Sequence, residues 1–110
     1  MNSRDVQIVE HINRHYNELL EEMKAAPTLE SFSHNLMVNK SVKMDLLQIG
    51  ECVNHLSEEF ISHLDKAEVK GITSVRNIVV HGYVQVDDAI IWNVVQEKLP
   101  HFIKSINEVK

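Results

Sequence analysis

Chain breakers are scarce in this sequence, and their scarcity constrains the fold more than any other feature. Its 110 residues include only 3 glycines and 2 prolines. A fold of many short strands needs frequent tight turns, and these two residues usually make them. The sequence therefore predicts a few long helices. At this length we expect a single domain, residues 1–110, with a modest hydrophobic core.

Apolar residues recur at steps of three and four, the period of a helix that buries one face. The first such stripe follows Ser3, a plausible N-cap, and ends before Pro27, after which Thr28 can cap a short turn. A second, heptad-like stripe belongs to a helix that opens at Asn39 and runs to Phe60. We expect these two segments to be antiparallel neighbours in a bundle.

Capping signals predict two more helices in the second half of the chain. Asp65 with Glu68 three residues later is a variant of the capping box, so a third helix should start near Lys66. Asp87 repeats the signal before the last apolar stripe. Pro100 lies inside that stripe and should bend the helix, because it has no N–H to donate. The expected fold is all-α, with four main helices plus a short one.

The stretch RNIVVHGYV, residues 76–84, can be read in two ways. Its three consecutive β-branched residues and a turn at His81 and Gly82 would suit a β-hairpin. Alternatively, the helix that starts near Lys66 continues to His81, and Gly82 takes the C′ position. A lone hairpin in a helical chain would be marginally stable, so the pattern favours the helix.

This segment also contains the residues best suited to chemistry. On a helix, Asn77 and His81 lie one turn apart on a shared face. Arg76 precedes His81 by five residues, so their directions differ by roughly 140°. Histidine can act as general acid or base and arginine can hold phosphate, which suits phosphodiester cleavage. A single histidine cannot play both parts in one step, whereas a symmetric dimer would supply two. Taken as composition alone, a structural role remains the commoner one.

A wider sequence pattern changes that balance. Arg76, His81 and Tyr83 form R-x-x-x-x-H-x-Y, with Asn77 directly after the arginine. The stretches LLQIGECVNHLSEE and VDDAIIWNVVQEKLP lie on either side of this motif. In all three respects the chain resembles the HepT-like HEPN family, the toxin half of HEPN/MNT toxin–antitoxin pairs. KAEVKG stands where that family usually has an Ile-Pro-Trp helix start.

The resemblance implies an antiparallel HEPN-type bundle that forms a homodimer and cleaves RNA without metal or cofactor. In this composite endoribonuclease site at the dimer cleft, Arg76 and His81 would be catalytic and Asn77 would assist. A type VII antitoxin, an MNT-type nucleotidyltransferase, would transfer AMP to Tyr83. The alternative is a non-catalytic HEPN module that binds nucleotide or RNA, or docks a nucleotidyltransferase. Glu51 also recurs in the family, and its pairing with a basic site residue is left open.

Bulk properties set limits on partners and location. The net charge of −5 argues against a general electrostatic hold on nucleic acid, so RNA must meet a local basic cleft. Cys52 is the only cysteine, which suits a reducing compartment. No apolar run approaches the length of a membrane helix, and the start MNSRDVQIVEH lacks a signal-peptide core. We therefore expect a cytoplasmic protein with no membrane partner.

Two remaining features have structural interpretations. His11 and His15 stand one turn apart, a spacing compatible with metal binding, but no acid or cysteine elsewhere completes a recognisable site. We expect two solvated histidines, beside a solvated acidic face of Glu18, Glu21 and Glu22. Gly50 is expected to permit close helix packing.

Overall fold

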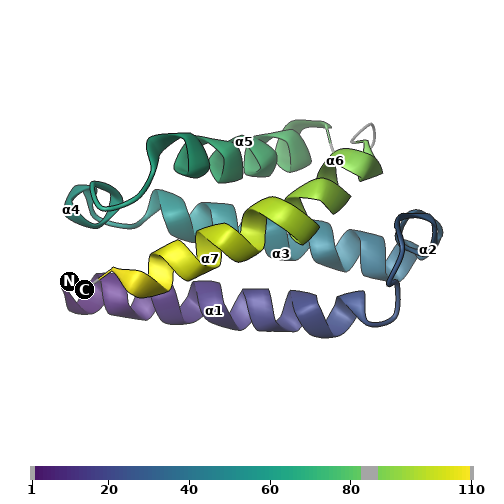
Figure 1. The fold of residues 1–110 in the computed structure, drawn as a ribbon, viewed down its shortest axis with the longest axis horizontal. Helices are drawn as coiled ribbons and strands as arrows, with labels where there is room; N and C mark the ends of the chain where they lie inside the picture. Colours follow the sequence, from purple (N-terminus) through teal and green to yellow (C-terminus); the bar gives the residue numbers. More distant parts are fainter. Residues whose placement is uncertain (1, 83–86, 110) are drawn as a thin grey trace.

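All the regular structure of the described residues is helical, which confirms the predicted all-α class (Figure 1). The computed structural model describes residues 2–82 and 87–109, apart from the side chain of His81. The elements are α1 (Ser3–Met23), α2 (Leu29–His34), α3 (Leu36–Asn54), α4 (Glu58–Ile61), α5 (Lys66–Gly82), α6 (Asp88–Asn93), the π-helical turn η2 (Val94–Lys98) and α7 (Leu99–Glu108). Within the described residues these form four main segments, namely α1, α3, α5 and the run from α6 through η2 to α7, accompanied by the short helices α2 and α4, one more short helix than expected.

The central element of the bundle is α3. It packs against α1 on one side and α5 on the other, while α7 crosses the bundle and contacts both α1 and α5 (Figure 1). No helix in the residues that the structure describes combines the length and the apolarity needed to span a bilayer.

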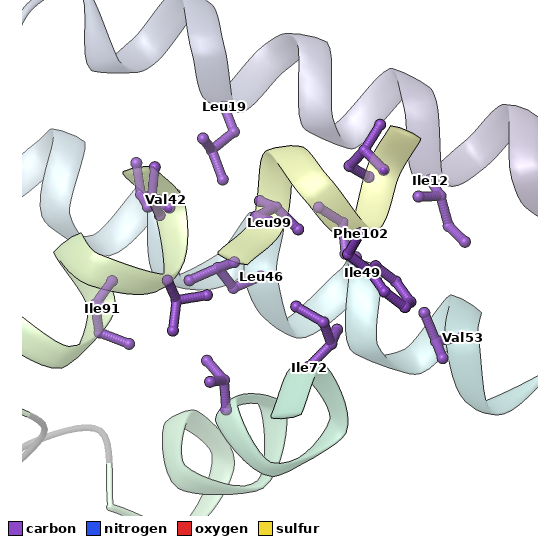
Figure 2. Packing of buried hydrophobic residues seen from close by; sticks show 14 of the residues in the cluster. Ile12, Leu19, Val42, Leu46, Ile49, Val53, Ile72, Ile91, Leu99 and Phe102 are labelled. Carbon is purple, nitrogen blue, oxygen red and sulfur yellow. The ribbon is translucent and has the colours of Figure 1, made fainter. Parts of the chain in front are cut away.

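The core lies where these four segments meet. Figure 2 shows side chains from α1, α3, α5, α6 and α7 converging on it, among them Ile12, Leu19, Val42, Leu46, Ile49, Val53, Ile72, Ile91, Leu99 and Phe102, all less than 5% exposed. Each such side chain stabilises the fold by about 1.5–3 kcal/mol relative to an exposed position. Most positions of the helical stripes of the sequence are buried, and Val9, Tyr16 and Val69 are partly buried and pack against the core.

The prediction for the start of α3 was wrong by three residues. The helix begins at Leu36, and the side-chain oxygen of Asn35 accepts a hydrogen bond from the backbone N–H of Val38 (3.1 Å). The expected cap, Asn39, instead lies buried inside the helix, where its amide donates to the carbonyl of Phe32 (3.4 Å). Both asparagines can cap a helix, and the packing of the chain before α3 decides between them.

The predicted end of α3 was also wrong. The helix stops at Asn54, and Phe60 belongs to the separate helix α4, which Ser57 caps. Asp5, in the first turn of α1, fixes this break: its carboxylate accepts hydrogen bonds from the backbone N–H (2.9 Å) and the hydroxyl (2.6 Å) of Ser57. These bonds hold the pKa of Asp5 below its ordinary value of 3.8. A contact distant in sequence therefore interrupts a continuous apolar stripe.

The helical interpretation is confirmed, and the hairpin is excluded because residues 78–80 are helical. The prediction for Gly82 was wrong: it is the last residue of α5 and not the C′ residue beyond the helix. As predicted, α5 begins at Lys66, and the carboxylate of Asp65 accepts from the backbone N–H groups of Ala67 (2.7 Å) and Glu68 (3.2 Å). The side chain of Glu68 does not return to the cap; it pairs with His101 of α7.

The last helical segment is interrupted one turn before Pro100. Asp87 caps α6 as predicted, by accepting from the N–H of Ala89 (2.9 Å). In η2 the N–H of Leu99 bonds to the carbonyl of Val94, five residues earlier. This wider turn precedes the proline, whose ring would clash with a carbonyl in a regular helix.

The short helices α2 and α6 pack against each other at one end of the bundle. Their contact includes the rings of Phe32 and Trp92, whose centroids lie 5.8 Å apart.

Candidate functional site

The candidate site is built where α5 approaches α3 most closely. A methyl group added at Gly50 would lie 2.8 Å from Cγ of Arg76 and closer still to its Cβ. Carbon atoms in ordinary contact are about 3.5–4.0 Å apart, so only glycine allows this approach. The prediction that Gly50 permits close helix packing is confirmed, and the residue it accommodates is Arg76.

The guanidinium of Arg76 is held from two directions. Its Nη2 donates to the carboxylate of Glu51 on α3, and its Nη1 donates to the side-chain oxygen of Asn77 (2.8 Å). The side chain of Arg76 is 26% exposed and that of Glu51 34%. Glu51 also lies 4.0 Å from Nε2 of His55. The open question about Glu51 is thereby answered: its carboxylate pairs with the arginine of the motif.

This arrangement leaves a fixed positive group at a half-exposed position. A guanidinium has five N–H donors in a planar fork, and Glu51 and Asn77 engage only part of it. Such a group can bind phosphate oxygens and stabilise negative charge that develops on them. Because neighbouring side chains already restrain Arg76, less freedom is lost when an anion binds.

The structure describes only part of the predicted motif. Arg76, Asn77 and Glu51 come together, and the backbone of His81 lies in the last turn of α5. The side chain of His81 and all of Tyr83 lie outside the described residues. Helix geometry alone puts Asn77 and His81 one turn apart, as expected from the sequence.

Beside this site, α3 and α5 border a hollow of about 440 Å³, lined by Lys40, Lys43, Met44, Leu47, Val79 and Val80. Met44 is 55% and Val80 39% exposed. Other large apolar side chains exposed on α3, α5 and α6 are Leu36, Met37, Ile78 and Ile90. Clustered apolar exposure of this kind marks interaction surfaces in soluble proteins.

The prediction of two solvated histidines on α1 was wrong for His15. His11 is exposed and accepts a hydrogen bond from Arg14 (2.6 Å). His15 is only 21% exposed, and its Nδ1 lies 3.6 Å from Oδ1 of Asp45 and 3.8 Å from Oε2 of Glu18. The acidic partner that the sequence pattern did not supply is Asp45 of α3, thirty residues after His15 in the chain.

Asp45 was missed by the sequence analysis, although its position held a signal. It follows Val42 by three residues and precedes Ile49 by four, the spacing of the buried stripe, and it is 6% exposed. Burial, with the carboxyls of Glu22 and Glu18 nearby, raises the pKa of Asp45 to about 8. Glu22 is also half-buried, so the predicted solvated acidic face holds only for Glu18 and Glu21.

Cys52 shows no sign of a reactive thiol. It is half-buried against the core, and burial raises its pKa. A thiol with a raised pKa is a poor nucleophile at neutral pH.

The fold and site define a helical bundle with a restrained arginine beside an apolar surface. The sequence model of the family described as "Ribonuclease HepT-like" matches residues 13–109. The chain therefore belongs to the HepT-like ribonuclease family, and the resemblance seen in the sequence is confirmed.

Three curated relatives are also similar in sequence and are named as RNases. "Putative RNase MJ0127" of Methanocaldococcus jannaschii is 34% identical over 82 residues, 74% of this chain and 68% of that protein. "Putative RNase TTE0752" of Caldanaerobacter subterraneus subsp. tengcongensis is 29% identical over 101 residues, 92% of this chain and 89% of that protein. "Putative RNase MJ1380" of Methanocaldococcus jannaschii is 28% identical over 110 residues, 99% of this chain and 100% of that protein. No solved structure matches the chain significantly.

Proposed function

We propose that this protein is the toxin of a type VII HEPN/MNT toxin–antitoxin system and cleaves RNA as a homodimer. The observation that carries the proposal is the restrained, half-exposed guanidinium of Arg76, five residues before His81. Family membership and relatives named as RNases support ribonuclease chemistry. A docking module would have no need to restrain an arginine five residues before a histidine in this way.

In the proposed mechanism, His81 of one protomer removes the proton from a ribose 2′-hydroxyl as it attacks the adjacent phosphorus. The partner's His81 protonates the departing 5′ oxygen, and the two Arg76 guanidinium groups stabilise the charge on the phosphorane. Asn77 holds Arg76 in place. The products are a 2′,3′-cyclic phosphate and a 5′-hydroxyl, and no step requires a metal ion.

The main test compares Arg76→Ala and His81→Ala with the wild type in an RNA cleavage assay containing EDTA. Each should slow cleavage by a factor of about 10²–10⁴, while circular dichroism and dimer mass stay unchanged. Arg14→Ala and His11→Ala are matched controls, because they remove the same side chains from the exposed face of α1. Wild-type cleavage rates in either site variant would refute the assignment of these site residues, whereas RNA binding by the wild type without any cleavage would support the non-catalytic HEPN module.

The dimer is supported by the exposed apolar surface around Met44 and Val80. A stable interface of this kind buries about 1,500 Å² or more in total. Light scattering should show a dimer at micromolar concentration, and Met44→Lys should weaken both dimer and cleavage.

Mixing the wild type with His81→Ala tests whether the site is composite. After subunit exchange of equal amounts, a site that needs both histidines retains about a quarter of the all-wild-type activity, whereas a site within one protomer retains about half. Retention of half would refute the composite site.

Neutralisation is proposed to occur through Tyr83, which lies two residues beyond His81. Transfer of AMP from ATP to its hydroxyl by an MNT-type nucleotidyltransferase antitoxin would add a negative phosphodiester. That charge could pair with Arg76 and repel RNA. Intact mass after incubation with the antitoxin and ATP should rise by AMP in the wild type and not in Tyr83→Phe. An equal increment in Tyr83→Phe would place the modification elsewhere.

A further inference from the structure

A second cluster of polar groups lies between α1 and α3, away from the arginine site. His15 and Glu18 of α1 and Asp45 of α3 each present one donor atom, and these atoms all lie within 4.8 Å of one another. The cluster draws on the face of α3 that meets α1, whereas Glu51 lies on α3 where it meets α5. The two sites are therefore separate.

The buried atoms of this cluster have no hydrogen-bond partners. Nδ1 of His15, Oδ2 of Asp45 and Oε1 of Glu22 are inaccessible to solvent and unpartnered. The distances of 3.6 and 3.8 Å from His15 to Asp45 and Glu18 exceed the 2.7–3.2 Å of a hydrogen bond. Leaving such buried groups unsatisfied destabilises the fold.

The cluster also has no lysine or arginine partner among the described residues, since none makes an ion pair with Glu18, Glu22 or Asp45. Asp45 is 6% exposed and faces the carboxyl of Glu22. Like-charged carboxyls held together at a buried position require a proton or a cation between them.

The spacing of the donor atoms is close to that of a metal coordination shell, although the carboxylate oxygens of Glu18 and Asp45, within 4.8 Å of each other, must approach by up to about 1.5 Å. Zn²⁺ binds imidazole nitrogen and carboxylate oxygen at about 2.0–2.2 Å, and donor atoms of such a tetrahedron are roughly 3.3–3.6 Å apart. The distances from Nδ1 of His15 to its two carboxylate neighbours need to shorten by only a few tenths of an ångström. One imidazole with carboxylates is a donor set that Zn²⁺ accepts.

We propose that His15, Glu18 and Asp45 bind one Zn²⁺ ion that fastens α1 to α3. Three protein ligands leave the fourth position of the tetrahedron for water, and Glu22 accepts a hydrogen bond from that water. The ion stabilises the fold because the folded chain brings its ligands together and the unfolded chain does not. This role goes beyond RNA cleavage and does not depend on it.

Calorimetric titration of the metal-free full-length protein with Zn²⁺ tests the proposal. The wild type should bind one ion per chain, and His15→Gln and Asp45→Asn should each bind at least about tenfold more weakly. His11→Gln is the matched control, since it makes the same change one turn away at an exposed position, and it should bind like the wild type. Zn²⁺ should raise the melting temperature of the wild type and His11→Gln only.

Asp45→Asn keeps the test independent of folding failure. Its amide has the shape of the carboxyl and carries no charge, so the metal-free variant should melt at or above the temperature of the metal-free wild type. Substitution with Co²⁺ should give the intense visible absorption of a tetrahedral site in the wild type alone of these two proteins.

The proposal would be overturned if the wild type does not bind Zn²⁺. It would also be overturned if His15→Gln and Asp45→Asn bind Zn²⁺ with the affinity of the wild type. Loss of binding in His11→Gln would do the same, because it would move the site to the exposed face of α1. RNA cleavage by Asp45→Asn in EDTA distinguishes failure of the Zn²⁺ proposal from failure of the ribonuclease assignment. If the ribonuclease assignment is right, this variant cleaves RNA in EDTA whether or not the wild type binds Zn²⁺.

Discussion

Two glycines of this bundle should respond in opposite directions to the same substitution. Gly50 and Gly71 both lie inside helices, without positive φ angles, so alanine gains about 1 kcal/mol of helix propensity at either position. At Gly71 the new methyl group meets nothing within 4 Å. Gly71→Ala should therefore raise the free energy of unfolding by about 1 kcal/mol.

At Gly50 the new methyl group would meet Arg76, with Cγ at 2.8 Å. Restoring ordinary contact requires a displacement of about 1 Å, and overpacking of this kind costs about 1–3 kcal/mol. Since the propensity gain is common to both variants, the difference in stability between them isolates this steric cost. Gly50→Ala should melt roughly 4–12 °C below Gly71→Ala.

Urea denaturation and thermal melting measured by circular dichroism would give both values. Cleavage adds a second readout, because Gly50→Ala displaces Arg76 and should slow the reaction even at temperatures where the variant is fully folded. If Gly50→Ala is as stable and as active as Gly71→Ala, the close approach of α5 to α3 does not exist as described.

Two further predictions concern polar contacts. Asp5→Asn should lower the melting temperature at pH 7, because Ser57 then loses a charged acceptor. The pKa of Asp5 is lowered in the folded protein, so its contribution to stability is present above about pH 4 and is lost as the pH falls through the folded pKa. The melting temperatures of the wild type and Asp5→Asn should therefore converge in acid. A difference that stays constant with pH would contradict this. Glu51→Gln should slow RNA cleavage by roughly tenfold by loosening Arg76, without loss of the dimer, and an unchanged rate would exclude a positioning role.

Local sequence signals predicted two helix starts correctly where a single side chain sets the boundary. Asp65 and Asp87 each cap a helix whose first residue follows directly, and both starts were correct. The expected cap Ser3 was wrong, because Asn2 caps α1 by accepting from the backbone N–H of Asp5 (2.7 Å) and Ser3 is the first helical residue.

The boundaries of α3 failed because they depend on tertiary contacts. Burial of Asn39 removes it as a cap, and the bond from Ser57 to Asp5 ends a stripe that contains no breaker.

In the candidate site, too, features set by local sequence were predicted and those set by contacts between helices were not. Arg76 and Asn77 were identified from the motif, which is contiguous in sequence, and their contact is present. Roles for these residues, and for His81 and Tyr83, remain predictions. The contact of His15 with Asp45 could not be predicted from spacing, because it joins two helices whose relative rotation is set by the whole core.

The π-helical turn η2 divides the C-terminal segment into two regular helices, α6 and α7. On one side of it, α6 packs on α2, where Trp92 meets Phe32; on the other, α7 packs on α1 and α5. Regular helices gain cooperativity from an unbroken ladder of hydrogen bonds, and the bond from Leu99 to Val94 breaks that regularity. Because Ile91 of α6 is buried in the same core as Leu99 and Phe102 of α7, the packing of side chains, and not an unbroken ladder of hydrogen bonds, couples the two halves of this segment.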